Sequence, residues 1–249
     1  CHIPLKELRE NRLTELNLKE KGIGVVGALV LAELLTVSAS LTQLDLSRNQ
    51  LGPEGAKALA PGLVNASLTT LVLKDNNLGP RGAQHLSDAL KINKSISELN
   101  ISNDGGSLSG DIKAEGAKYI ADMLVVNASL TQLDLSRNRL GHEGANALAR
   151  GLVSASLTSL NLRNNSIKDA GAIAIATALK DSQVCKMADL NLRNNDIGLE
   201  GAKAIAEFCA VSASLTSLDV GHNSIDQEQA LKLLGSREET AQRKAAGLA

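Results

Sequence analysis

Three arginines recur at similar positions in the second half of the sequence and are its clearest candidates for binding chemistry. Arg137 lies in the segment LDLSRN, and Arg163 and Arg193 lie in two copies of LNLRNN. A guanidinium group can donate two parallel hydrogen bonds to a carboxylate or a phosphate. If the three side chains share one face, they would bind a short anion or an acidic protein segment. Alternating charges also keep the surface of a soluble protein hydrated, and this alternative stays open.

Oxygen-bearing side chains gather in NDGGSLSGD, residues 103–111, and could bind a metal ion. The side chains that could surround a calcium ion are those of Asp104, Ser107, Ser109 and Asp111. Calcium prefers oxygen ligands of this kind, but the spacing departs from the helix-loop-helix calcium pattern, which ends on a glutamate. Calcium binding is therefore one of three interpretations of this stretch.

No arrangement of reactive side chains indicates an enzyme. The histidines lie far apart and lack the spacing of metal ligands; they are His2, His85, His142 and His222. The glycines do not form the phosphate-binding pattern G-x-x-x-x-G-K-[ST]. The sequence therefore predicts a protein with no catalytic residues, no metal site and no cofactor.

Charge and composition argue against further classes of function. Lys and Arg number 26 against 27 Asp and Glu, and the net charge of −1 is unlike that of nucleic-acid-binding proteins with a strong positive field. The same balance argues against attachment to anionic membranes, and no apolar run reaches the ~20 residues of a transmembrane helix. The three cysteines are far apart, which favours a reducing compartment over a disulfide framework. We therefore expect a cytoplasmic protein.

A repeat organises nearly the whole sequence. Residues 41–67, LTQLDLSRNQLGPEGAKALAPGLVNAS, and residues 130–156, LTQLDLSRNRLGHEGANALARGLVSAS, are nearly identical and equal in length. Weaker copies begin at Leu13, Leu68, Ile96, Leu157, Met187 and Leu215. A period of this length indicates a solenoid, in which stacked units share a core that one unit could not form alone.

Each unit reads as a short strand, a turn and a helix. The alternation L-x-x-L-x-L predicts a strand with its leucines directed inward. An asparagine follows the strand in most units, and its amide can bond to backbone groups where the strand turns away. These asparagines predict a buried ladder, formed by Asn49, Asn76, Asn138, Asn165, Asn195 and Asn223. A helical pattern follows, and Pro61 predicts that the helix of the second unit ends early or kinks.

The unit L-x-x-L-x-L-x-x-N-x-L-G-x-E-G-A-x-x-L resembles the ribonuclease-inhibitor-like leucine-rich repeat over residues 13–226. Its phrasing GAxxLAxxL…NxSLTxLxL is most similar to the repeats of NOD-like receptors. The resemblance implies an α/β fold, a curved solenoid or horseshoe of about eight repeats, with parallel strands on the concave face and helices on the convex face. We expect one domain over residues 1–249, with an N-terminal cap at 1–12 and a C-terminal cap and tail at 227–249.

The residues expected to face outward from the strands form the candidate partner-binding surface. They are polar and mixed in sign, and the aromatic anchors that dominate tight interfaces are missing from them. We therefore expect a moderate, salt-sensitive interaction. The candidate residues are Asp45, Arg48, Lys74, Asp75, Asp134, Arg137, Arg163, Arg193 and His222. Asn103 is expected to face outward as well, at the position equivalent to Arg48 and Arg137.

The unit that begins at Ile96 is longer than the others because it contains a glycine-rich insertion, residues 105–110. Aligning Asp104 with Asn49 places the insertion where the strand turns toward the helix, on a rim of the solenoid. Besides the calcium interpretation, it is either a contact loop for a partner or a neutral insertion. The candidate residues of the loop are Asp104, Gly105, Gly106, Ser107 and Asp111.

These observations predict a non-enzymatic protein-interaction module or scaffold. The resemblance implies that its concave face or rims bind a protein partner of unknown identity. We expect no nucleic-acid partner and no direct membrane insertion. Two alternatives stay open: a GTPase-activating protein of the Ran-activator type, which has the same kind of repeat, and a structural subunit of a larger complex.

Overall fold

Short strands alternate with helices along the whole described chain. The computed structural model describes residues 3–104 and 110–225. The strands are β1 (Glu15–Asn17), β2 (Gln43–Asp45), β3 (Thr70–Val72), β4 (Glu98–Asn100), β5 (Gln132–Asp134), β6 (Ser159–Asn161), β7 (Asp189–Asn191) and β8 (Ser217–Asp219). The helices are α1 (Leu5–Arg9), α2 (Gly24–Leu35), α3 (Gly52–Leu63), α4 (Gly79–Ile92), α5 (Lys113–Val126), α6 (Gly141–Leu152), α7 (Lys168–Asp181) and α8 (Leu199–Val211).

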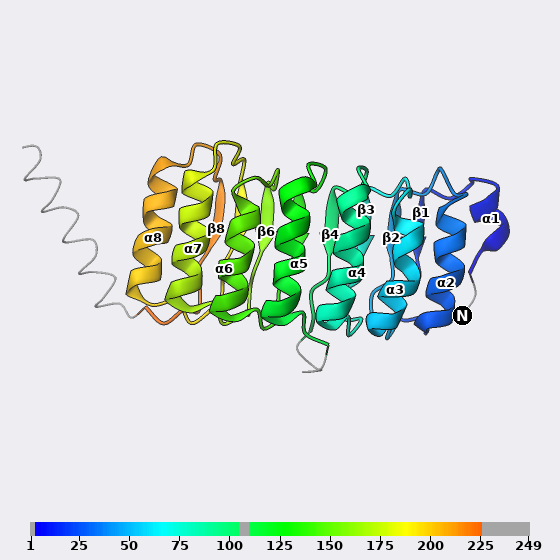
Figure 1. Ribbon diagram of the computed structural model, residues 1–249, viewed down its shortest axis with the longest axis horizontal. Helices are drawn as coiled ribbons and strands as arrows, with labels where there is room; N and C mark the ends of the chain where they lie inside the picture. The colour runs from blue at the N-terminus through cyan, green and yellow to red at the C-terminus, as the bar shows by residue number, and fades with distance from the viewer. Residues whose placement is uncertain (1–2, 105–109, 226–249) are drawn as a thin grey trace, which may run out of the picture.

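The strands form one open parallel sheet in sequence order, β1 to β8. Equivalent residues of successive repeats are direct partners, as in the series Leu16, Leu44 and Leu71. Figure 1 shows the helices side by side in one layer with the strands in a second layer behind them. This arrangement confirms the predicted α/β solenoid. The predicted N-terminal cap contains α1, whereas the predicted C-terminal cap at 227–249 lies outside the described residues.

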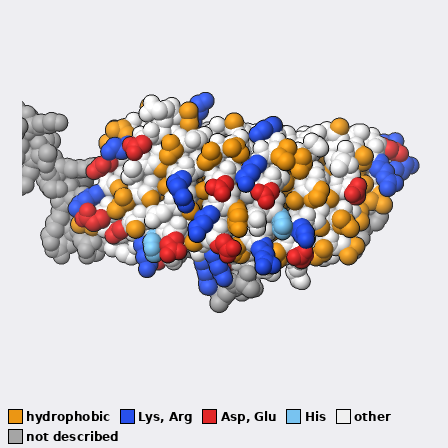
Figure 2. Space-filling model, viewed as in Figure 1, with side chains coloured by type: hydrophobic (Ala, Val, Ile, Leu, Met, Phe, Trp, Pro, Cys, Tyr) orange, Lys and Arg blue, Asp and Glu red, His pale blue; other side chains and the backbone are white. Residues whose placement is uncertain are grey.

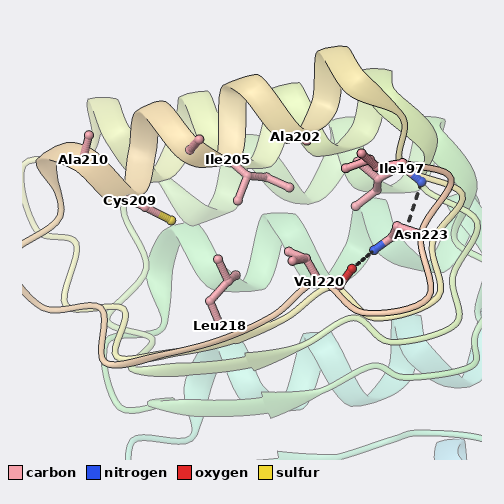
Figure 3. Close-up of a pocket in the computed structure, with 10 residues that line it drawn as sticks. Ile197, Ala202, Ile205, Cys209, Ala210, Leu218, Val220 and Asn223 are labelled. Atoms are coloured by element: carbon pink, nitrogen blue, oxygen red, sulfur yellow. Dashed lines mark hydrogen bonds between the residues drawn. The ribbon is translucent and has the colours of Figure 1, made fainter. Parts of the chain in front are cut away.

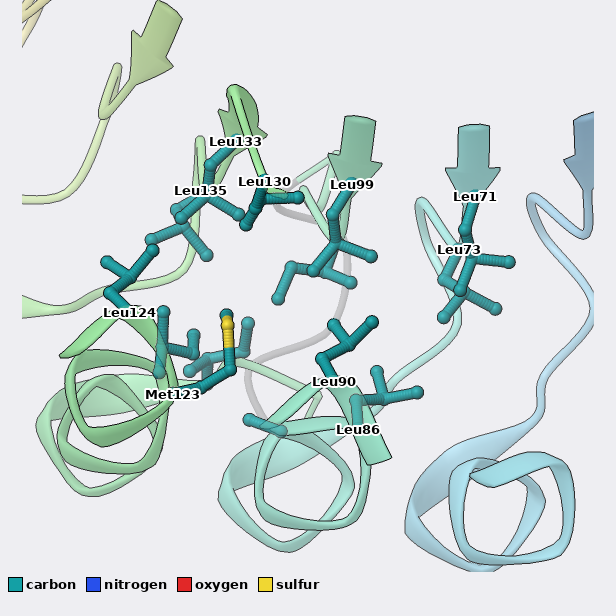
Figure 4. Packing of buried hydrophobic residues seen from close by; sticks show 14 of the residues in the cluster. Leu71, Leu73, Leu86, Leu90, Leu99, Met123, Leu124, Leu130, Leu133 and Leu135 are labelled. Atoms are coloured by element: carbon teal, nitrogen blue, oxygen red, sulfur yellow. The ribbon is translucent and has the colours of Figure 1, made fainter. Parts of the chain in front are cut away.

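Leucines from both layers fill the space between strands and helices. Leu71 of β3 and Leu99 of β4 are at most 2% exposed, as are Leu86 and Leu90 of α4. Figure 4 shows Leu99 directed toward Leu86 and Leu90 across this space. Full burial of one leucine stabilises a fold by about 1.5–3 kcal/mol. Because each layer buries its leucines against the next, the sheet and the helix layer form only as a stack.

In most layers an asparagine at the end of the strand joins the layer to the preceding one. Asn165 is fully buried, and its Nδ2 donates to the carbonyl of Leu162 in its own layer (2.9 Å) and to that of Leu135 in the preceding layer (3.0 Å). Its Oδ1 accepts from the backbone N–H groups of Asn138 (2.9 Å) and Leu140 (3.4 Å). The predicted ladder is therefore confirmed, and its members are buried except Asn223, which is half-buried in the last described layer. The same four kinds of bond are made by Asn49, Asn76 and Asn223.

The layer that contains the insertion keeps the ladder by using two substitute groups. The carbonyl of Gly110 accepts from the N–H of Gly79 (3.0 Å), as ladder carbonyls do in other layers. The side-chain Nδ2 of Asn103 donates to Oδ1 of Asn138 (2.8 Å), a bond that a backbone N–H makes elsewhere. Asn103 is only 9% exposed, so the prediction that it faces outward is wrong. The alignment of exposed Asp104 with a ladder asparagine is also wrong, because Gly110 takes that place.

Two glycines allow neighbouring helices to lie very close together. A Cβ atom on Gly62 of α3 would lie 2.3 Å from the backbone oxygen of Ala32 in α2. A Cβ atom on Gly151 of α6 would lie 2.6 Å from the backbone oxygen of Ala121 in α5. Any side chain at these positions would therefore push two helices apart.

The helix α3 continues through Pro61 and ends at Leu63. The prediction that it ends early at Pro61 is therefore wrong. The proline lies in the last turn and is exposed, so it removes one hydrogen bond near the end of the helix. Leu63 is fully buried, and its burial keeps this last turn against the core.

We predict that Gly62→Ala lowers the free energy of unfolding, measured by urea denaturation, by about 1–3 kcal/mol. The added methyl group would overlap backbone atoms of α2, which cannot rotate away as a side chain could. The matched control is Lys57→Ala, an exposed position on the same helix, for which we expect a change within about 0.5 kcal/mol. Equal stability of the two variants would contradict this account of helix packing.

Candidate functional site

The outward side of the sheet is a continuous surface that no described helix covers. We call it the strand face: the outward side chains of β1–β8, together with the two residues that precede each ladder position. Backbone bonds between layers continue beyond the strands, for example from the N–H of Arg137 to the carbonyl of Arg163 (2.8 Å). The helices α2–α8 lie on the opposite side of the sheet (Figure 1). The strand face is therefore rigid and open.

In seven of the eight strands the last residue is Asp or Asn, and its side chain caps the turn that follows; the exception is Val72 of β3. Oδ1 of Asp134 accepts from the backbone N–H of Ser136 (2.8 Å), and Oδ1 of Asp45 does the same toward Ser47 (2.8 Å). Asn161 makes the equivalent bond in β6, so an amide serves the fold as well as a carboxylate. Asp45 and Asp134 were predicted to contact a partner, and each has one oxygen engaged in the fold.

Four of the predicted contact residues occupy the same position in the turn. Arg48, Asp75, Arg137 and His222 have φ values of 56°, 56°, 58° and 55°. This left-handed region disfavours side chains by roughly 1–2 kcal/mol per residue. The bonds between layers hold the backbone in this conformation, so these residues are held on a fixed turn.

Arg48 and Asp75 are brought together by the structure. Nε of Arg48 lies 3.2 Å from Oδ2 of Asp75, and its Nη1 lies 2.9 Å from Oε1 of Glu20. The hydrogen bonds to Glu20 and Asp75, together with their charges, raise the pKa of Arg48. The side chain of Asp75 is only 7% exposed, so it has little surface with which to contact a partner.

The three arginines named from the sequence lie on adjacent layers. Arg163 is exposed, Arg137 donates to the backbone carbonyl of Asp104, and Nη1 of Arg193 lies 3.6 Å from Oδ2 of Asp219. Their layers are neighbours because β5, β6 and β7 pair in that order. The other predicted residues of the face, in the third and eighth layers, are Lys74 and His222.

A hollow of about 210 Å³ lies in the strand face across β4 to β7. Its rim and floor include three carboxylates, those of Glu98, Asp134 and Asp189. Sequence reasoning named only Asp134, because it followed the position after the second leucine of each repeat. Side chains alternate along a strand, so the residue two positions earlier faces the same side. That rule could have found Glu98 and Asp189.

The carboxylate of Asp111, at the end of the insertion, is turned into the protein. Asp111 is 2% exposed, its Oδ2 lies 3.2 Å from Nε of Arg139, and its Oδ1 accepts from Asn103 (3.3 Å). Burial raises the pKa of this carboxyl group, against the lowering effects of Arg139, Lys113 and the Asn103 bond. The predicted loop residues Gly105, Gly106 and Ser107 lie outside the described residues. Calcium binding and partner contact by this loop stay predictions.

Six segments of the sequence match the family model described as Leucine Rich repeat. They are residues 37–60, 64–87, 126–149, 153–176, 185–206 and 211–233. Together they make up more than half of the chain. The chain belongs to the leucine-rich repeat family.

Solved structures resemble the chain at low sequence identity, and a search of the curated proteins found no match. The structure of leiomodin-1 actin-binding site 2 is 23% identical, covers 60% of this chain and 87% of its own, and has a TM-score of 0.48. The TLR13–ssRNA13 complex is 20% identical, covers 86% of this chain and 25% of its own, and has a TM-score of 0.46. At such identity a likeness concerns the fold alone.

A second, apolar hollow of about 450 Å³ lies at the last described leucine-rich repeat. Figure 3 shows Ile205 and Cys209 of α8 on one side of it and Leu218 and Val220 on the other. Val220 is 39% exposed, whereas the equivalent Leu192 of the preceding repeat is fully buried. The chain continues from this edge into residues that the structure does not describe, so the hollow carries no ligand assignment.

The helix side of the leucine-rich repeats carries interspersed charges. Figure 2 shows basic, acidic and hydrophobic side chains mixed over the face formed by the helices. The most exposed apolar side chains of α2 are Val26 (77%) and Leu29 (57%), where the equivalent positions of α3 hold Glu54 and Lys57. This helix differs from its neighbours in that respect, and nothing in the structure identifies a partner for it.

Within residues 3–104 and 110–225, no helix combines the length and the apolar character needed to cross a membrane. The same residues contain no group of three or more His, Cys, Asp and Glu side chains that could hold a metal ion. Two cysteines of these ranges, Cys185 and Cys209, form no disulfide.

The buried carboxylate gives a pH prediction. Because the pKa of Asp111 is raised in the folded state, the folded protein binds this proton more tightly than the unfolded chain. The free energy of unfolding therefore falls as the pH rises from about 4 through the raised pKa. Asp111→Asn keeps an oxygen that can accept from Asn103 and removes the charge. We expect urea denaturation to show the variant more stable than the wild type at neutral pH, with a difference that shrinks on acidification.

The control for this prediction is Asp122→Asn, an exposed position on α5. It should show no pH-dependent difference from the wild type. A stability difference for Asp111→Asn that grows on acidification would contradict the assignment of a raised pKa to Asp111.

Proposed function

We propose that the chain is a non-enzymatic protein-interaction module that binds its partner through the strand face. The observation that carries this proposal is an open sheet of eight leucine-rich repeats whose outward side no described element covers. Binding surfaces of this extended kind are what solenoids offer. The likeness of the repeat unit to ribonuclease-inhibitor-like repeats, and to NOD-like receptor repeats in particular, supports a protein partner.

Rigidity favours the strand face over a mobile surface as the binding site. Its side chains stand on short strands and turns whose backbone groups are bonded between layers. A surface that is ordered before binding loses less conformational entropy when a partner docks. The partner would therefore meet side chains whose backbone positions are already fixed.

The composition of the strand face predicts the strength of the interaction. Its outward positions on β1–β8 carry no Trp, Tyr or Phe, the residues that usually supply hydrophobic anchors. Charged and amide side chains dominate instead. We therefore propose a moderate affinity that depends on ionic strength, since contacts between exposed charges are screened by salt.

The proposal is tested by affinity capture with the wild type and the double variant Arg163→Glu/Arg193→Glu. Arg163 is exposed and Arg193 is half-buried, and they lie on adjacent layers of the strand face. We expect proteins captured by the wild type to be lost from the variant, because charge reversal repels what the arginines attract. Affinity for a captured partner should fall by an order of magnitude or more between about 50 and 300 mM salt.

The matched control is Lys57→Glu/Lys118→Glu, which makes the same charge change at exposed positions of α3 and α5. It should capture the same proteins as the wild type. Loss of capture with the helix variant and not with the strand-face variant would refute the strand face as the binding surface.

A further inference from the structure

Acidic residues occupy the outward positions of the strands themselves. The first and last residues of each strand face outward, and none of them in β1–β8 is Lys or Arg. We call the carboxylates at these positions the acidic band: Glu15, Asp45, Glu98, Asp134, Asp189 and Asp219. The opening of the hollow lies within this band, between β4 and β7.

Basic residues lie two or three positions after the last residue of a strand. We call these the basic ridge: Lys19, Arg48, Lys74, Arg137, Arg163 and Arg193. The acids at these turn positions, Glu20 and Asp75, are both bonded to Arg48. In the layers of β5 to β7 these two turn positions hold only arginines, serine and asparagines, with no acid among them. The strand face is therefore divided by charge, although the sequence reads as a mixture.

The carboxylates of the hollow are bonded to neutral groups. Oε2 of Glu98 accepts from the hydroxyl of Thr70 (3.3 Å), and Oδ2 of Asp189 accepts from the hydroxyl of Ser159 (3.2 Å). Asp134 accepts from a backbone N–H. Among the ion pairs of the described residues, none involves Glu98, Asp134 or Asp189. Three like charges in one hollow repel each other, and a cation placed between them would relieve this repulsion.

The fold does not require these charges. The position of Asp134 is occupied by Asn100, Asn161 and Asn191 in neighbouring layers, and their side chains cap the turn in the same way. The position of Glu98 and Asp189 holds glutamine in β2 and β5 and serine in β6 and β8. Neutral residues at the equivalent positions of other repeats form the same structure. The charges are therefore properties of the surface and not requirements of the fold.

From this division we propose that the strand face binds a partner helix with one basic and one acidic flank. Lysine or arginine side chains of the basic flank enter the acidic hollow, and carboxylates of the acidic flank bind Arg137, Arg163 and Arg193. This inference rests on the proposed function and specifies its partner.

The spacing of the layers suits a helix that runs along the stack. Neighbouring strands lie about 4.8 Å apart, and a helix rises about 5.4 Å per turn. A helix with one charged side chain per turn on each flank would therefore place about one charge of each sign opposite each layer. The basic ridge lies two or three residues beyond the last residue of each strand, which is about 7–10 Å along an extended chain. That distance fits the two flanks of one helix, and the basic ridge would repel a helix that is basic all round.

The test uses synthetic helical peptides as probes, with binding followed by NMR shift perturbation and isothermal titration at low salt. One peptide carries lysines along one flank and glutamates along the other. A second has the same composition with the two residue types mixed on both flanks, and a third carries lysines on both flanks. We expect the first to bind at least about tenfold more tightly than the other two, with shifts in β4–β7 and the arginine turns.

The variants separate the two bands. Glu98→Gln/Asp134→Asn/Asp189→Ser, which uses residues found at equivalent positions of other layers, should weaken binding of the first peptide by about tenfold or more. Arg137→Gln/Arg163→Gln/Arg193→Gln should do the same. The matched control Glu115→Gln/Asp122→Asn/Glu143→Gln removes three exposed charges from helices and should leave binding unchanged.

Three results would overturn the proposal: no binding of the first peptide, equal binding of the mixed peptide, or tighter binding of the all-lysine peptide. These failures are distinguishable from failure of the proposed function. If the peptides fail but the Arg163→Glu/Arg193→Glu variant still loses the proteins captured by the wild type, the strand face binds a partner of other chemistry. If the peptides fail and the Arg163→Glu/Arg193→Glu variant captures the same proteins as the wild type, both the strand-face proposal and the helix proposal fail.

Discussion

The structure depends on the buried amide of the ladder asparagine. One side chain satisfies two carbonyls and two N–H groups that the strands leave unpaired where they turn toward the helices. Buried backbone groups without partners are strongly unfavourable, so this amide fixes both the turn and the spacing of successive layers. The layer with the insertion supports this view. It has no asparagine at the usual place, and Asn103 reaches in from a neighbouring position to bond to Asn138.

The ladder separates what the fold needs from what the surface can vary. Leucines and ladder asparagines occupy the inward positions and are almost fully buried in the second to seventh layers. At the last position of the strand a carboxylate and an amide cap the turn equally, as Asp134 and Asn161 show, and β3 has Val72 there. Charge at these positions is therefore available for recognition, and the repeats distribute it in two bands. A partner would bind to a surface whose geometry is set by the interior.

Much of the fold could be predicted because each residue pattern recurs in several repeats. The recurring asparagine predicted the ladder, and the alternating leucines predicted the strands. The errors came where one layer departs from the pattern. Pro61 suggested that α3 ends early, but the helix continues to Leu63, whose burial offsets the lost hydrogen bond. The acidic hollow was missed because its carboxylates come from β4, β5 and β7, and only the pairing of the strands brings them together.

The most direct test of this account is the free energy of unfolding of Asn165→Ala, measured by urea denaturation beside Asn146→Ala. Asn146 is exposed on α6, whereas Asn165 is fully buried between two layers. We predict a loss of about 3 kcal/mol for Asn165→Ala, since several buried backbone groups lose their partners, and a change within about 0.5 kcal/mol for the exposed position. If both variants unfold with the same free energy, the ladder does not hold the layers together and the account is wrong.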